Sequence, residues 1–150
     1  MGSTNRKNIF FDMDGVLCDF IKRRDMIKER YPEIEYPQSQ VGFFSRLEPI
    51  EGAVESFNKL KECGKYNCYI LTRPSIKNIH CYTEKAEWIK EYLGEDILEN
   101  MILACDKSLI KGDYLIDDVT VHGQDRFEGE HIHFGQEKFP DWDSVLDYLL

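Results

Sequence analysis

The 150-residue sequence lacks any hydrophobic run long enough to cross a membrane, and no apolar signal core follows its first residues. It also lacks internal repeats and low-complexity segments. Residues 1–7 are predicted to form a short polar tail. The length suits a single domain over residues 1–150, which can bury roughly two thirds of its unfolded surface. We therefore predict a cytoplasmic protein without a membrane partner.

Positive charge is scarce, because 19 Lys and Arg face 28 Asp and Glu and leave a net charge of −9. A protein that binds a nucleic-acid polymer needs a basic stripe to neutralise phosphates, and none is present. A small anionic substrate remains compatible with this charge if a metal ion and a few cations gather locally. Hydrophobic residues make up 42% of the chain and aromatic residues 13%, as in globular proteins.

Cysteines are few and unpaired in pattern. Their odd count and the absence of a Cys-x-x-Cys spacing argue against a disulfide framework or a zinc site. We predict reduced thiols in the core at Cys18, Cys63, Cys68, Cys81 and Cys105. His131 and His133 alternate as strand residues do, which favours a structural place for both over a role as metal ligands.

Short apolar runs alternate along the chain with segments of helical periodicity. Strands are predicted over residues 8–11, 68–72, 101–104, 114–116 and 131–134. Helices are predicted over residues 19–31, 49–63, 83–93 and 141–149, the last one capped by Asp141. Short strands that are apolar on both faces are typical of a parallel sheet with helices on both sides. We therefore predict a Rossmann-like three-layer α/β/α fold with a mainly parallel five-stranded sheet.

The first strand ends in two carboxylates, Asp12 and Asp14, followed at once by Gly15. Residues at i and i+2 of a strand lie on one face, so both carboxylates can lean into one pocket. They would repel each other, and one pKa would rise, unless a cation sits between them. A surface turn of the type Asp-x-Asp-Gly is the simpler alternative.

Further polar residues follow the other predicted strands: Thr72, Lys107, Asp117 and Asp118. In a parallel sheet the strand ends meet at one crevice, so these residues are expected to converge with Asp12 and Asp14. Phosphoryl transfer needs such a set. A carboxylate attacks phosphorus, a second carboxylic acid protonates the leaving oxygen, and a hydroxyl and an ammonium hold the remaining phosphate oxygens. Carboxylates together with substrate phosphate also suit Mg²⁺.

The pattern resembles the haloacid dehalogenase-like superfamily, whose four motifs occur here in order. The first is similar to residues 11–16, the second to residues 70–72, the third to Lys107 and the fourth to residues 116–118. The resemblance implies that Asp12 is the nucleophile and Asp14 the general acid/base. It also implies that Mg²⁺ is held by Asp12, by the backbone carbonyl of Asp14 and by Asp117 or Asp118, or both. An aspartate at position 14 favours a phosphatase over a dehalogenase.

A closer resemblance is to the 5'(3')-deoxyribonucleotidase family. It is carried by residues 12–20, 47–55, 106–108 and 115–118, and by Glu84-Lys85 with Trp88. It implies a phosphomonoesterase that forms an aspartyl-phosphate intermediate and acts on a nucleoside monophosphate, often a deoxypyrimidine one. It also implies a small substrate-covering cap at about residues 19–48, in which Phe20 matches an aromatic residue that surrounds the base.

The sequence departs from that family in two places. The cap segment is much shorter, so we expect weak selection among bases, a high KM for nucleotides, or a partner subunit that completes the pocket. Phe43 or Phe44 could substitute for missing aromatic residues. Arg73 follows Thr72 where a small hydroxyl residue is expected, and it is either a second phosphate contact or a solvated rim residue.

The alternatives left open are a phosphatase for another small ester, such as a sugar phosphate, and an inactive phosphate- or metal-binding module. A homo-oligomer also remains open.

Overall fold

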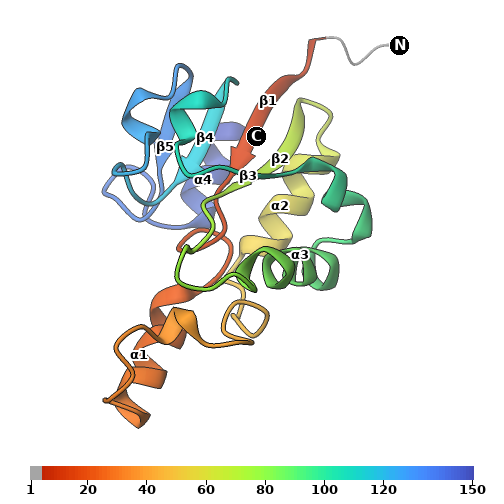
Figure 1. The fold of residues 1–150 in the computed structure, drawn as a ribbon. Coiled ribbons are helices and arrows are strands. Elements are labelled where there is room, and N and C mark those ends of the chain that lie inside the picture. The colour runs from red at the N-terminus through yellow and green to blue at the C-terminus, as the bar shows by residue number, and fades with distance from the viewer. Residues whose placement is uncertain (1–4) are drawn as a thin grey trace.

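The computed structural model describes residues 5–150, and its centre is a five-stranded sheet in which every described strand runs parallel to its neighbours (Figure 1). The strands are β1 (Lys7–Phe11), β2 (Tyr66–Thr72), β3 (Met101–Leu103), β4 (Tyr114–Asp117) and β5 (Glu130–His133). Their spatial order is β3-β2-β1-β4-β5. This confirms the predicted Rossmann-type α/β fold. Lys7 belongs to β1 and not to a polar tail, and residues 1–4 of that tail lie outside the described residues.

Strand register aligns the ends of the central strands. Phe11, the last residue of β1, pairs with Ile70 of β2 on one side and with Ile116 of β4 on the other. The residues that follow these three positions therefore emerge at one edge of the sheet. Because β1 is central and its residues Ile9 to Phe11 are buried, this edge is fixed from both sides.

One face of the sheet is covered by three α-helices, α2 (Ala53–Glu62), α3 (Cys81–Tyr92) and α4 (Trp142–Leu149). Their apolar residues form one buried cluster with Ile9 and Phe11 of β1. The predicted cap of α4 is confirmed, because the Asp141 side chain accepts from the Ser144 amide. Helix α2 begins later than predicted, since Gly52 adopts a φ of +80° that no α-helix interior contains.

The opposite face carries a smaller cluster of Phe10, Leu71, Leu115 and Phe127. It is covered by the 3₁₀ turns η4 (Lys107–Leu109) and η5 (Gln124–Arg126) with their flanking loops. Helices were predicted on both faces of the sheet, but among the described residues only one face is covered by α-helices. The two connections on this face, residues 104–113 and 118–129, are too short to contain a helix of ordinary length together with its turns.

Residues 19–48, which we call the cap, extend from the sheet edge as helix α1 (Phe20–Arg30), the turn η2 (Pro37–Ser39) and irregular chain (Figure 1). Asp19 caps α1 by accepting from the Lys22 amide. None of the residues of α1 is buried. The remaining short turn, η3 (Glu95–Asn100), joins α3 to β3.

The second part of the cap is held by α3 and the turn before it. The Glu84 carboxylate accepts from the amides of Gly42 at 2.7 Å and Phe44 at 3.0 Å. The Asn78 amide donates to two further cap carbonyls, at residues 38 and 40. The cap thus has one loosely packed part, α1, and one firmly held part, residues 38–44.

All five cysteines are free, as predicted, but they do not all lie in the core. Cys18, Cys68 and Cys81 are buried, whereas Cys63 and Cys105 are exposed. The prediction was wrong for these two because Cys63 ends α2 and Cys105 lies in the loop after β3, where neither strand nor helix packing covers it. Within residues 5–150, no helix combines the length and apolarity that a bilayer crossing requires.

Candidate active site

The loop after β1 carries Asp12 and Asp14 around a tight turn. The Met13 carbonyl accepts from the amides of residues 16, 17 and 18, and the Gly15 amide donates to the Cys18 carbonyl. Gly15 has a φ of +86°, and a Cβ there would lie 2.0 Å from Oδ2 of Asp118. Only glycine therefore lets this loop pass so close to the end of β4.

Lys107 lies between two carboxylates at the sheet edge. Its Nζ donates to Oδ1 of Asp12 at 2.8 Å and to Oδ2 of Asp117 at 2.6 Å, and all three side chains are buried. Burial disfavours the ammonium, but Asp12 and Asp117 together outweigh it and raise the Lys107 pKa. Burial raises the pKa of Asp12 well above its usual range; the attraction of Lys107 opposes this rise, and Asp117 and Asp118 add to it.

Asp118, next along the chain, adds a third carboxylate. One oxygen from each of Asp12, Asp117 and Asp118 lies within 4.8 Å of the others. Burial, partly offset by a hydrogen bond to Asp12, raises the Asp118 pKa to about 6. Asp117 is fully buried and also accepts from Gln124, whereas Asp118 is half-buried and faces the cavity.

Lys85, which carries part of the family resemblance but was not predicted as a site residue, lies on α3 and is 1% exposed. Its Nζ donates to Oδ2 of Asp14 at 3.1 Å, to the Thr72 hydroxyl and to the Arg73 carbonyl at 2.9 Å. It therefore fixes three of the predicted site residues at once. A signal was present, because Lys85 and Glu84 occupy buried positions of α3 between Cys81 and Trp88, where apolar residues are expected.

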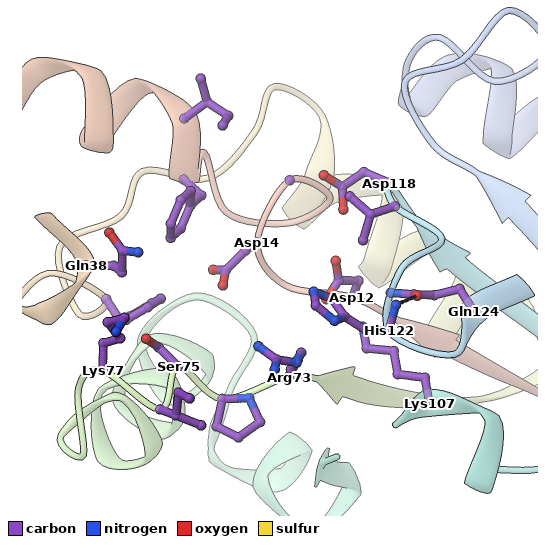
Figure 2. Close-up of a pocket in the computed structure, with 17 residues that line it drawn as sticks. Asp12, Asp14, Gln38, Arg73, Ser75, Lys77, Lys107, Asp118, His122 and Gln124 are labelled. Carbon is purple, nitrogen blue, oxygen red and sulfur yellow. Dashed lines mark hydrogen bonds and ion pairs between the residues drawn. The ribbon is translucent and has the colours of Figure 1, made fainter. Parts of the chain in front are cut away.

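A cavity of about 450 Å³ opens at this edge of the sheet (Figure 2). Carboxylates line one part and cations another, while cap residues close a third side. Its lining includes Asp12, Asp14, Gly15, Asp118, Arg73, Lys77, Lys107, Phe20, Ile21, Gln38, Phe44, Val119, His122 and Gln124, together with residues 74–76. Four of the six predicted converging residues, Asp12, Asp14, Lys107 and Asp118, thus face one space. Thr72 and Asp117 lie behind it, each hydrogen-bonded to a buried lysine.

The cap aromatic residues divide into two groups. Phe20 and Phe44 line the cavity, whereas Phe43 is 1% exposed and is absent from the lining. Phe43 instead packs against both, with ring centroids 5.3 Å from Phe20 and 5.0 Å from Phe44. Its predicted contact with substrate is therefore not supported by its position, and its place is one of support. The reason is the turn at Gly42, which directs Phe43 inward beneath its two neighbours.

Two histidines support the end of β4, and they are strand residues as predicted. Nε2 of His131 lies 3.0 Å from the Asp117 carbonyl oxygen, and Nε2 of His133 lies 3.0 Å from that of Asp118. A carbonyl only accepts, so each Nε2 carries the proton. Burial lowers the pKa of His131. His122 and Gln124, which also line the cavity, were not predicted, because their loop carries no periodic pattern.

An all-parallel sheet with carboxylates, a lysine and a glycine turn at its carboxyl edge places the chain among the haloacid dehalogenase-like hydrolases. Residues 29–140 match the family model described as "5' nucleotidase, deoxy (Pyrimidine), cytosolic type C protein". A Vibrio phage KVP40 protein, provisionally named a 5'(3')-deoxyribonucleotidase, is 39% identical over 97% of this chain and 86% of its own. The human cytosolic-type 5'(3')-deoxyribonucleotidase is 31% identical over 92% of this chain and 78% of its own.

The chain therefore belongs to the 5'(3')-deoxyribonucleotidase family, whose members are phosphoric monoester hydrolases. The family-model match begins after Asp12 and Asp14, whereas the phage protein aligns over almost the whole chain. A solved haloacid dehalogenase-like hydrolase from Burkholderia xenovorans LB400 is 13% identical and covers 75% of this chain and 73% of its own, with a TM-score of 0.44. At that value it adds no weight to the assignment.

Proposed function

We propose that the protein is a nucleoside monophosphatase that acts through Asp12 and Asp14 with Mg²⁺ as its cofactor. The observation that carries the proposal is the convergence of Asp12, Asp14, Lys107 and Asp118 on one cavity, although they come from widely separated parts of the chain. The buried Lys107 bridge supports it further, since a purely structural surface turn would not bury a lysine between two carboxylates.

In the first half of the reaction, an Asp12 carboxylate oxygen attacks phosphorus and the ester oxygen leaves. Asp14 gives its proton to that oxygen, so a free nucleoside and an aspartyl phosphate result. In the second half, Asp14 takes a proton from water, the water oxygen attacks phosphorus, and orthophosphate leaves Asp12 regenerated. Lys107 keeps Asp12 oriented and favours its charged, nucleophilic form, which burial alone would disfavour.

The two oxygens of the Asp14 carboxyl group have different surroundings. Oδ2 is held by Lys85, while Oδ1 is buried and has no hydrogen-bond partner among the described residues. A buried oxygen without a partner is costly, so a ligand group in the cavity would satisfy it. The ester oxygen of a substrate is such a group. Oδ1 is thus the carboxyl oxygen that is left for a contact with the leaving oxygen.

The residues present also fit a divalent cation. One oxygen from each of three carboxylates lies within 4.8 Å of the others, and among the described residues only Lys107 forms an ion pair with any of them. Burial is the main cause of the raised pKa values of Asp12 and Asp118, and the negative charge of Asp117 adds to both. Asp12, Asp118, the Asp14 carbonyl and, with Lys107 displaced from it, Asp117 would hold Mg²⁺. When bound, Mg²⁺ would neutralise charge on the transferring phosphoryl group.

A nucleotide suits the space above these groups. A volume of about 450 Å³ is typical of small-ligand sites. Phe20 and Phe44 offer ring faces or edges to a base on the cap side, and Lys77 and Gln38 lie at the same rim. Because Phe20 and Phe44 are the only Phe, Tyr or Trp residues of the described chain that line the cavity, we infer broad acceptance of bases. The absence of a basic surface stripe favours a monomeric nucleotide over a polymer, and a cytoplasmic location remains a prediction.

Release of orthophosphate from a panel of nucleoside 5'- and 3'-monophosphates and sugar phosphates, with and without Mg²⁺, tests the proposal. We expect turnover of deoxynucleoside monophosphates with little dependence on the base, and no turnover without a divalent cation. A preference for sugar phosphates would mean that the proposed phosphatase chemistry acts on another class of substrate. No release from any member of the panel would contradict the proposal.

A further inference from the structure

Most cations around the cavity already have partners. Lys107 is paired with Asp12 and Asp117, and Lys85 with Asp14 and the Thr72 hydroxyl. The ammonium of Lys77 lies 4.4 Å from the centre of the Tyr36 ring, at the outer rim. A phosphate dianion that enters the cavity therefore meets lysines that already contact protein carboxylates or, in the case of Lys77, an aromatic ring.

Arg73 is the exception among the cavity residues that the structure describes. Its guanidinium forms no ion pair, and its Nε is buried without a hydrogen-bond partner. Figure 2 shows its side chain within the ring of labelled cavity residues, between Asp14 and Lys107 in this view. A buried guanidinium nitrogen without an acceptor is costly unless a ligand supplies one.

The backbone of Arg73 is also held in place. Its carbonyl accepts from Nζ of Lys85 at 2.9 Å, and the preceding residue, Thr72, ends the fully buried part of β2. Arg73 therefore starts from a fixed point one residue beyond the strand. Its charge acts within the cavity, because Arg73 and Lys107 both add to the burial that lowers the pKa of His122, another lining residue.

We propose that Arg73 is the phosphate anchor of this site and binds the non-bridging phosphate oxygens through its planar fork. The inference rests on the proposed phosphatase function and deepens it. Most of the binding affinity for the substrate then comes from contacts with its phosphate and not from contacts with its nucleoside. Because the product orthophosphate carries the same oxygens, it is a competitive ligand of the free enzyme, and Arg73 sets its affinity.

The test is calorimetric titration of orthophosphate into the protein in excess Mg²⁺, for wild type and for Arg73→Met. Loss of one hydrogen-bonded charge pair corresponds to about 10- to 100-fold in affinity, and we expect the phosphate Kd to rise by that factor. The KM of every substrate should rise by a similar factor whatever its base. Lys77→Met removes the same charge from the rim and should change the phosphate Kd by less than about threefold.

Should Arg73→Met fail to fold, Arg73→Gln replaces it with the same expected loss. An unchanged phosphate Kd in a folded Arg73 variant would overturn the anchor. So would an equal effect of Lys77→Met, or a rise in KM confined to nucleotides, which would place Arg73 against the nucleoside. Failure of the proposed function is a separate result, because it appears as absence of turnover in the wild-type protein.

Discussion

The two sides of the cavity are built in opposite ways. On the sheet side, which we call the catalytic floor, the buried carboxylates of Asp12 and Asp117 both accept from the buried Lys107, and Asp14 is held by Lys85. On the cap side, α1 has no buried residue, and Phe20 and Phe44 are the two described cap residues whose aromatic rings line the cavity. Side-chain positions are therefore fixed by buried contacts on the catalytic floor, whereas those on α1 are only loosely constrained.

This difference indicates which side of the cavity can select among substrates. Catalytic groups held by buried partners do not need to reorganise when the reaction proceeds, so the chemical step depends little on what the phosphate is attached to. Recognition of the attached group depends on contacts that the short cap supplies sparingly. An enzyme of this design should be demanding about phosphate and tolerant about the rest of the substrate.

The strongest test of the floor is Asp12→Asn. The amide has nearly the shape of the acid but cannot attack phosphorus, so we expect turnover to fall by more than about a thousandfold. Thermal unfolding should show a folded protein. Asp25→Asn, an exposed carboxylate of α1, is the matched control and should keep full activity. An Asp12→Asn variant that retains a tenth of the wild-type rate would mean that another residue is the nucleophile.

Lys107→Met should show how much the stability of the catalytic floor depends on the Lys107 contacts with Asp12 and Asp117. Removing the ammonium leaves two buried carboxylates unpaired, which costs about 3–5 kcal/mol in the free energy of unfolding at neutral pH. The loss should shrink as the pH falls, because protonation of Asp12 relieves the repulsion, and chemical denaturation at several pH values measures this. Lys111→Met breaks an exposed pair with Glu128 and should change stability by less than about 0.5 kcal/mol. Equal effects of the two changes would contradict the bridge.

The response to Mg²⁺ should depend on pH through Asp118. The folded-state pKa of Asp118, about 6, lies above its unfolded value, so in the metal-free protein its stabilising contribution is present at low pH and is lost as the pH rises through 6. Mg²⁺ requires the charged carboxylate and should reverse this loss, by about 2.7 kcal/mol at a hundred times Kd. Melting temperatures with and without Mg²⁺ should diverge above pH 6 and converge below it. A gain that is independent of pH would exclude Asp118 as a ligand.

Phe20→Ala should have the smallest effect and should act on substrate recognition. One stacked aromatic residue contributes at most about 1–3 kcal/mol to binding of a base, and Phe44 remains. We expect the KM for nucleotides to rise by up to roughly tenfold and the KM for p-nitrophenyl phosphate to change less. Met26→Ala, at an exposed position of α1, is the control and should leave both unchanged. Equal effects on both substrates would show that Phe20 supports the floor and does not contact the base.

The floor was largely predictable from the sequence because each of its residues follows a short apolar run. A buried strand that stops at a polar residue fixes the place of that residue at the sheet edge, which holds for Asp12 and Asp118 alike. Lys85 could not be placed in this way, since its partners lie in the loop after β1 and at the end of β2 and meet Lys85 only through helix packing. Its place beside Glu84 in the family resemblance and its charge at a buried position of α3 were the available signals.

The opposite sheet face and the cap were predicted less well. The pattern of apolar strands predicts that both faces are covered, but it does not say whether an α-helix or a loop provides the cover. Phe43 and Phe44 are identical in type and adjacent, so composition could not show that only Phe44 reaches the cavity. That distinction is made by the turn at Gly42 and by Glu84, which are held together through tertiary contacts.

Glu84 and Lys85 are neighbours in one turn of α3, yet one holds the cap at Gly42 and Phe44 and the other holds Asp14 and Thr72. A helical turn moves as a rigid body, because its backbone hydrogen bonds do not let adjacent residues shift independently. We therefore expect a displacement of residues 42–44 to shift the contact between Lys85 and Asp14, the proposed proton donor. The position of the cap and the position of that carboxyl group are thus linked through one helical turn.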